Sequence, residues 1–381
     1  MPLNRVPDGA ELGRDVSSGR ADGMPLLRAG TALNPRYRDA LLRAGIHAVY
    51  VKDEATEGIE PQQVISAETR AVATQAGGHA FEAASDAFKA GRPLSADALE
   101  QLDSIAARMA REIANTGDFA LALADLSAAD GYTLQHSVDV AALGLLIGQR
   151  LFRDRGYVDY RGRQTYEKVD ARLTRLGLGL LLHDIGKLVV PSEILNKPGK
   201  LDPHEWEVMK THPLAGVELL RSELISPLVK VVVRSHHERW DGGGYPDGKS
   251  EREIHELARI AAVADVYDAV TSERVYAAAR PAHAGVRIIR EGRGTAFDPE
   301  IVDAFSKIVA PFPAGDPVEL SDGRGGVVAS VRENAVDRPV VRVIGDGEPY
   351  DLALADNPRI QIVGWEDMAP EPAAPVMHWA L

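Results

Sequence analysis

The chain has 381 residues, of which 45% are hydrophobic and 26% charged, and its formal net charge is −13. This composition is ordinary for a globular protein with more than one domain, and no apolar run approaches the ~20 residues that a membrane-spanning helix needs. The negative balance disfavours broad binding to DNA, which requires a basic surface, but allows a small anionic ligand beside a metal or a few cations.

The chain contains no cysteine, which excludes thiolate metal ligands and disulfides. The N-terminal sequence MPLNRVPDGAELGRD lacks the apolar core of a signal peptide. The expected location is therefore the cytoplasm.

The first 130 residues predict a small α/β N-terminal unit (1–60) followed by a helical linker region (61–130). The unit has short strands at 26–27 and 48–51, and a helix over 36–43 that starts with an Asn34 cap and a Pro35. The linker region is rich in alanine and breaks at 91–93. Its second half carries one apolar stripe, which indicates packing rather than a site: Leu99, Leu102, Ile105, Ala106, Met109 and Ile113.

Residues 131–310 predict a helical domain. Helices are expected near 136–151, up to 183, from a capping box at 202–205 through His212 to Pro213, over 231–237 and over 258–271, with two short ones within 281–310. The segment 153–170 is polar and reads as a loop, and the glycine-rich stretch 240–248 as irregular backbone.

Residues 315–365 change character, because β-branched runs at 327–328, 340–344 and 360–363 alternate with Asp-Gly turns. They predict a small antiparallel β-module, followed by a disordered tail at 366–381. The expected fold class is mainly α: an all-helical domain with a small N-terminal α/β unit and a small C-terminal antiparallel β-module.

Histidines and aspartates gather near the ends of the predicted helices. A lone histidine on an apolar face is usually a core or surface residue, but five in one helical domain, with two aspartates, form a candidate site: His136, His183, Asp184, His212, His236, His237 and Asp265. Imidazole and carboxylate ligands together suit Fe, Mn, Zn, Co or Ni. Seven ligands exceed the needs of one catalytic ion but suit two that share a carboxylate, and paired metals with a bridging hydroxide cleave phosphoesters.

Six motifs, in order, resemble those of the HD-GYP subgroup of HD-domain phosphohydrolases. HDIGK at 183–187, HHERWDGGGYP at 236–246 and RIAAVADVYDAVTSERVY at 259–276 carry most of the resemblance. YTLQHSVDVAALG at 132–144, LDPHEWEVMKTHP at 201–213 and GTAFDPEIVDAF at 294–305 complete it. The resemblance implies an all-α HD domain that uses metals, commonly iron or manganese, to hydrolyse cyclic di-GMP to the linear dinucleotide or GMP.

Carried over by position, the resemblance also implies residue roles. One metal would be held by His136, His183, Asp184 and Asp265, and a second by Asp184, as the bridge, with His212, His236 and His237. Lys187 would stabilise the phosphate or the attacking hydroxide. Gly244 and Tyr245 would shape the guanine side of the pocket, Arg274 would contact a phosphate oxygen, and Asp268 would support a ligand or line the pocket.

Several of these roles have structural alternatives. Lys187 could answer the helix dipole, Tyr245 could be loop packing, Arg274 could pair with Glu273 or Asp268, and Asp268 could be purely structural. Tyr132 stands where members with a third metal carry a glutamate, which favours two metals. Ala277 stands where many members have a basic residue, a gap that Arg280 could fill.

Three functions follow from these observations. The first is a metal-dependent cyclic di-GMP phosphodiesterase. The second is a non-catalytic cyclic dinucleotide sensor or adaptor, and the third an HD phosphohydrolase for another nucleotide. The possible protein partners are a second copy of this chain, in a homodimer, or a signalling partner that binds the N-terminal unit.

Overall fold

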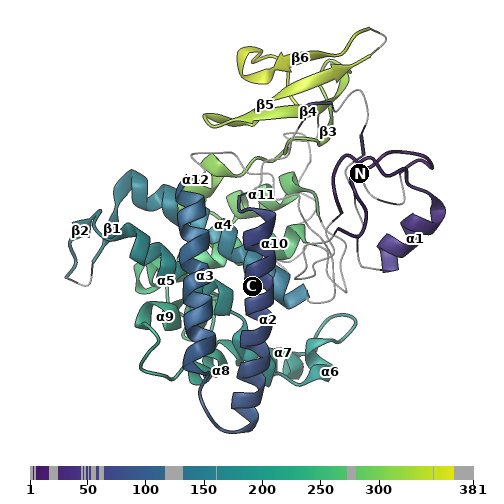
Figure 1. Cartoon of the computed structure of the whole chain (residues 1–381). Coiled ribbons are helices and arrows are strands. Elements are labelled where there is room, and N and C mark those ends of the chain that lie inside the picture. Colours follow the sequence, from purple (N-terminus) through teal and green to yellow (C-terminus); the bar gives the residue numbers. More distant parts are fainter. Residues whose placement is uncertain are drawn as a thin grey trace. The chain divides into compact units, whose positions relative to one another are not determined.

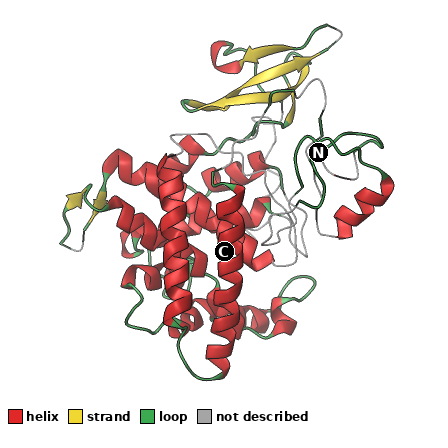
Figure 2. Ribbon diagram, viewed as in Figure 1, coloured by secondary structure: helices red, strands yellow, loops and turns green. Residues whose placement is uncertain are grey.

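The computed structural model describes residues 3, 6–16, 25–43, 46, 49, 51–52, 57–59, 64–115, 132–159, 161–272, 280–345 and 347–363. They fall into two compact units: the larger contains the helices from α2 to α12, and the other contains α1 and strands β3 to β6 (Figure 1). Helices dominate the larger unit, as Figure 2 shows. Among the described residues, no helix combines the length and the apolarity needed to cross a bilayer.

The larger unit is a stack of helices around two apolar ones, α5 and α10. In chain order its helices are α2 (Ala67–Lys89), α3 (Ala96–Asn115), α4 (Tyr132–Arg155), α5 (Val169–Leu182), η3 (Ile185–Val189), α6 (Ser192–Leu195), α7 (Pro203–Met209), α8 (His212–Leu219), α9 (Pro227–Ser235), η4 (Glu251–Glu253), α10 (Glu256–Thr271), α11 (Ala282–Glu291) and α12 (Pro299–Ile308). Nearly every residue of α10 is buried, which is typical of a helix at the centre of a bundle.

Helices α2 and α3 belong to the same compact unit as the later helices and lie side by side (Figure 1). The apolar stripe expected on α3 is buried in full, and α3 packs on α5. Close approach of α4 to α5 depends on Gly144 and Gly148, because a Cβ there would lie 2.5 Å and 2.7 Å from Leu180 and Leu176 side-chain atoms. These contacts seat the two helices that carry the first histidines.

Two expectations about this unit are wrong in detail. The segment after α4 contains a two-stranded antiparallel hairpin, β1 (Tyr157–Val158) and β2 (Gln164–Thr165), where a loop was expected. Gly162, with φ +74°, lies in its turn, and its strands are too short to show alternation. His212 does not end the helix that starts at the capping box: it begins α8, and Pro213 occupies the first turn, where a missing N–H costs no hydrogen bond.

The C-terminal sheet has the order β3-β4-β5-β6 and is antiparallel throughout, with β3 (Pro317–Glu319), β4 (Gly325–Arg332), β5 (Ala335–Ile344) and β6 (Tyr350–Ala353). Val341 and Val343 face the core and alternate with Arg342, as in a half-buried strand. The expected strand at 360–363 is wrong: its Ile362 forms one isolated bridge with Leu320. The tail at 366–381 lies outside the described residues.

The N-terminal segment has a separate small core, which includes Leu12, Leu33 and Leu41. Helix α1 (Pro35–Arg43) forms where the Asn-Pro start predicted it, and the Asn34 side chain accepts a hydrogen bond from the Tyr37 N–H at 2.8 Å. The expected strands here are represented by single bridges, such as Val16 with Leu27. Ala48 and Tyr50 lie outside the described residues.

Candidate metal centre

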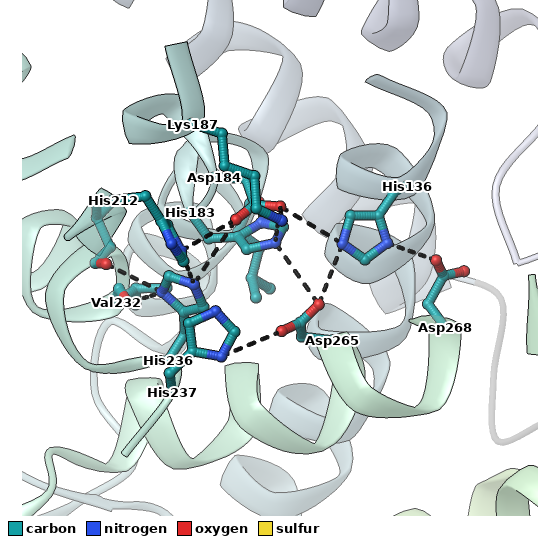
Figure 3. A network of polar contacts seen from close by, with 12 residues as sticks. His136, His183, Asp184, Lys187, His212, Val232, His236, His237, Asp265 and Asp268 are labelled. Atoms are coloured by element: carbon teal, nitrogen blue, oxygen red, sulfur yellow. Dashed lines mark hydrogen bonds and ion pairs between the residues drawn. The ribbon is translucent and has the colours of Figure 1, made fainter. Parts of the chain in front are cut away.

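Seven side chains from five helices converge inside the larger unit (Figure 3). None of them is more than 7% exposed. His136 lies in the second turn of α4, His183 follows the last residue of α5, and His212 begins α8. Asp184 comes directly after His183. His236 and His237 follow α9, and Asp265 lies on α10. Residues far apart in the sequence thus meet at one point.

Backbone hydrogen bonds orient three of the imidazoles. Each donates from Nδ1 to a main-chain carbonyl of the preceding helical turn: His183 to Leu180 at 2.7 Å, His212 to Met209 at 2.9 Å, and His236 to Val233 at 3.0 Å. A neutral imidazole that donates from Nδ1 keeps its lone pair on Nε2. The fold therefore turns three Nε2 lone pairs toward the interior of the cluster, as metal-binding histidines require.

The carboxylate of Asp184 lies between two sets of histidines. Its Oδ1 is 3.4 Å from Nε2 of His212 and 3.9 Å from Nε2 of His236. Its Oδ2 is 3.5 Å from Nε2 of His183 and 3.9 Å from Nε2 of His136. One carboxylate therefore presents a different oxygen to each set, which is the arrangement that a bridging ligand needs.

The seven residues form two groups whose candidate ligand atoms lie within 4.8 Å of one another: Asp184, His212, His236 and His237 in one, and His136, His183 and Asp265 in the other. In the part of the chain that the structure describes, the buried Nε2 of His183 and Oδ1 of Asp184 have no hydrogen-bond partner. Buried polar atoms normally have one. Two buried lone-pair atoms that lack a donor fit a cation, so the cluster is compatible with divalent metal binding.

His136 differs from the other imidazoles because both its ring nitrogens meet carboxylates. Nδ1 is 2.6 Å from Oδ2 of Asp268 and Nε2 is 3.1 Å from Oδ1 of Asp265, and Asp268 also accepts a hydrogen bond from the Ser272 hydroxyl at 2.9 Å. Burial by itself lowers the pKa of His136, but the hydrogen bonds to Asp265 and Asp268 outweigh it and raise the pKa to about 9. Asp268 thus orients the His136 ring through Nδ1, while Nε2 faces Asp265.

The histidines of the other group are neutral at pH 7. Burial lowers the pKa of His212 to about 4 and that of His236 to about 3, and it holds the pKa of His237 well below its usual range. Removing an imidazolium from water is costly, and the neighbouring carboxylates only partly offset that cost. Neutral imidazole is the form that binds a metal.

Lys187 contacts the central carboxylate through its ammonium group. Its Nζ lies 2.5 Å from Oδ2 of Asp184, and its side chain is 27% exposed. Burial by itself raises the pKa of Asp184, but the Lys187 ammonium and the imidazoles around the carboxylate together outweigh burial and hold that pKa well below its usual range. Lys187 therefore helps to keep Asp184 ionised and places a positive charge at the edge of the site.

The glycine-rich loop at 240–248 folds back onto a member of the cluster. A Cβ on Gly244 would lie 2.4 Å from the Arg239 nitrogen and 2.5 Å from the His237 carbonyl oxygen, so only glycine fits there. The next residue, Tyr245, donates its N–H to that same carbonyl at 3.2 Å. The ring of Trp206 meets that of Tyr245 edge-on, with centroids 6.0 Å apart.

Two residues that lie beside this loop were not predicted from the sequence as part of the site. Glu238 is 2% exposed and accepts hydrogen bonds from the backbone N–H groups of Asp247, at 2.8 Å, and Lys249, at 3.0 Å. Its position between a His-His pair and a glycine-rich loop was the available signal. Trp206 stood in a predicted helix with nothing to separate it from a packing residue. Both now belong to the surroundings of the cluster.

Some predicted contacts cannot be placed. Arg274 and Ala277 lie outside the described residues, so the expected phosphate contact is not located. Arg280 is described, and its backbone N–H donates to the Val270 carbonyl at 3.1 Å.

Comparison with known proteins agrees with the resemblance. The HD domain family model matches residues 146–301. A cyclic di-GMP phosphodiesterase of Pseudomonas aeruginosa is 39% identical over 280 residues, which cover 71% of this chain and 63% of that protein. One of Thermotoga maritima is 43% identical, covering 36% of this chain and 38% of the relative. A 3′3′-cGAMP-specific phosphodiesterase of Vibrio cholerae is 41% identical, covering 41% and 34%.

Residues 146–301 match the HD domain family, and HDIGK at 183–187 with the Gly-Tyr-Pro loop at 244–246 gives this region motifs that resemble those of the HD-GYP group. The chain spans less than two thirds of the length of these three relatives.

Proposed function

We propose that this protein is a metal-dependent phosphodiesterase that hydrolyses cyclic di-GMP. The observation that carries the proposal is the buried cluster of seven ligands in two groups, with the two oxygens of Asp184 facing different groups. The names of its relatives as cyclic di-GMP phosphodiesterases support the choice of substrate.

We assign His136, His183, Asp184 and Asp265 to one divalent cation, and Asp184, His212, His236 and His237 to a second. Iron or manganese is the expected metal, with zinc, cobalt and nickel as the other candidates for such ligands. When bound, such a pair supplies Lewis-acid polarisation of the phosphoryl group and a nucleophile derived from water.

The side chains around the ligands have distinct tasks in this proposal. Asp268 holds the Nδ1 proton of His136, so that Nε2 faces the cluster. Lys187, partly exposed beside Asp184, offers its ammonium to a phosphate oxygen. Gly244 lets the loop reach His237, and Tyr245 forms the wall against which a guanine base packs. Arg274 is proposed as a phosphate contact on sequence grounds alone.

The reaction adds water across one phosphodiester bond. The water oxygen bonds to phosphorus in line with the leaving 3′ oxygen, the P–O3′ bond breaks, and that oxygen takes up a proton. The product of one cleavage is the linear dinucleotide, and a second cleavage gives GMP. Most of the catalysis expected of such a site is positioning and charge neutralisation.

A second substrate belongs in the same assay, because one relative is named as specific for 3′3′-cGAMP. Purified protein, loaded anaerobically with Fe²⁺ or Mn²⁺, is incubated with cyclic di-GMP and with 3′3′-cGAMP, and products are separated by liquid chromatography. Faster cleavage of cyclic di-GMP is expected. Micromolar binding without turnover at full metal occupancy would select the sensor function, and cleavage of 3′3′-cGAMP alone would reassign the substrate.

The parts outside the helical domain are proposed to carry regulation. We assign residues 131–310 to catalysis, the N-terminal unit (1–60) to a signalling partner or a homodimer contact, and the β-module (315–365) to a supporting role. Analytical ultracentrifugation of the full chain, with and without ligand, tests the oligomeric part of this assignment.

A further inference from the structure

A buried ion pair ties helix α2 to the helix that carries His136. Arg70 of α2 contacts Asp139 of α4 through Nη1 and Oδ1, although the two residues are 69 positions apart. Their side chains are only 17% and 4% exposed. Helix α2 precedes all six motifs, so this pair links a segment outside the recognised domain to the interior of the domain.

Asp139 is buried on the same helix as His136. It lies one helical turn after His136 on α4, and its second oxygen accepts a hydrogen bond from Gln135 Nε2 at 3.0 Å. Its charge repels that of Asp268, the carboxylate that binds Nδ1 of His136. Asp139 and Asp268 are thus two buried carboxylates that repel each other, and Arg70 supplies a cation that balances the charge of Asp139.

Other residues of α2 pack against α4 and η3, which carry or follow residues of the site. A Cβ on Gly77 would lie 3.4 Å from a side-chain atom of Leu134, and a Cβ on Gly78 would lie 3.5 Å from another, so α2 packs closely on the first turn of α4. Helix α2 also contacts η3, which follows Asp184 and contains Lys187. A displacement of α2 would therefore reach α4 and η3 together.

We propose that Arg70 is a positioning residue of the metal centre, which acts through Asp139 to hold the Asp268–His136 pair in place. The proposal rests on the proposed metal-dependent function. Breaking a buried ion pair leaves its partner as an uncompensated charge, which is strongly destabilising locally. Without Arg70, Asp139 remains beside Asp268, and movement of either carboxylate disturbs the orientation of His136 Nε2. Helix α2 then controls occupancy of the His136–His183–Asp265 group.

The test compares metal binding with stability in matched variants. Arg70→Ala removes the cation, and Arg70→Lys keeps a charge but loses the planar fork. Arg259→Ala is the control, because Arg259 forms a similarly buried pair with Asp298, with side chains 13% and 2% exposed. Metals per chain are counted by mass spectrometry during titration of the metal-free protein with Mn²⁺ against a chelator, and melting temperatures are recorded alongside.

We expect wild type to bind two ions, and Arg70→Ala to bind one of them about tenfold more weakly with the other unchanged, as loss of a residue that orients a ligand does. Arg259→Ala should lower the melting temperature but keep both ions. Adding Asp139→Asn to Arg70→Ala should restore the weakened ion, because the unbalanced charge is gone. If Arg70→Ala does not fold, Arg70→Lys carries the same test with a smaller shift.

If wild type binds two ions and both Arg70 variants bind them with unchanged affinity, the role of Arg70 is refuted while the proposed function stands. The inference also fails if Arg70→Ala and Arg259→Ala lose both ions in parallel with their stability, since the role of Arg70 would then be structural. A wild-type protein that takes up no metal would overturn the proposed function as well.

Discussion

The ring of Tyr245 lies stacked on the ring of His237, with centroids 4.7 Å apart and planes at 25°. This contact joins the glycine-rich loop to the group of metal-ligand candidates that contains His212 and His236. The stack exists because Gly244 lets the backbone turn within van der Waals reach of the His237 carbonyl. The loop that we propose to shape the substrate side of the site is thereby fixed to a candidate metal ligand.

Tyr245→Ala is expected to raise KM more than it lowers kcat, because loss of a wall that packs equally against substrate and transition state removes uniform binding. Tyr245→Phe is the control, since it keeps the stacked ring and should stay within a few-fold of wild type. Steady-state kinetics with cyclic di-GMP measure both constants. An unchanged KM in Tyr245→Ala would remove this residue from the substrate pocket.

Asp184→Ala is expected to lose more metal and more activity than His183→Ala. The aspartate presents an oxygen to both groups, whereas His183 Nε2 faces only one. Asp184→Ala should lose both ions and reduce activity on the order of a thousandfold, since Lewis-acid stabilisation contributes several kcal/mol. Metal counts on the purified variants decide the point: two ions in Asp184→Ala would show that it is not the bridge.

Much of the site could be predicted because its members carry local signals. His183 and His236 each follow an apolar helix, and a polar residue at the end of such a helix must face a polar interior or solvent. The capping box at Asp202 and the break at 91–93 are likewise short-range features, and the helices they predict are present. The roles of the seven site residues remain proposals, but their convergence is now a structural fact.

What could not be predicted depends on long-range contacts. No pattern within α2 distinguishes Arg70 from a surface arginine, since Asp139 reaches it only through tertiary packing. The strand β6 at Tyr350–Ala353 is short and half polar, and it pairs because Val343 and Val341 lie opposite. Glu238 accepts hydrogen bonds from backbone N–H groups nine and eleven positions away, and its residue type alone does not predict these contacts.

Glu238→Gln is expected to destabilise the loop. The buried carboxylate accepts two backbone N–H groups, and an amide can offer only one oxygen to them, which leaves one donor unsatisfied at about 1–3 kcal/mol. Chemical denaturation measures the loss, and KM should rise because Tyr245 belongs to the same loop. Glu253→Gln, in a capping box on the exposed η4, is the control and should cost less. Equal losses in the two variants would contradict the loop assignment.

Metal binding at pH 7 is expected to release about one proton per chain, from His136. Its pKa of about 9 means that the metal-free protein holds a proton there, while His212 and His236, with pKa values of about 4 and 3, hold none. Affinity for that ion should therefore rise with pH and level off near pH 9.

Calorimetry in two buffers of different ionisation enthalpy counts the released protons. Asp268→Asn removes a hydrogen bond that raises the His136 pKa, so it should release fewer. The raised pKa also stabilises the metal-free fold below pH 6.5, and this contribution disappears as the pH rises through about 9. No proton release at pH 7 would contradict the protonation state of His136.

Gly186→Ala is expected to separate the metal ligands. A Cβ at Gly186 would lie 1.9 Å from the His212 carbonyl oxygen and 2.5 Å from the Gly216 nitrogen, so η3 and α8 must move apart. That movement displaces Asp184 from His212, whose Oδ1 and Nε2 are 3.4 Å apart. Overpacking against backbone should cost about 3 kcal/mol and weaken the ion of the His212 group first. Gly78→Ala is the matched control, because its nearest neighbour is a Leu134 side-chain atom at 3.5 Å, and alanine there favours the helix. Denaturant midpoints and metal counts for the two variants test this, and equal behaviour would show that η3 and α8 can move apart without cost.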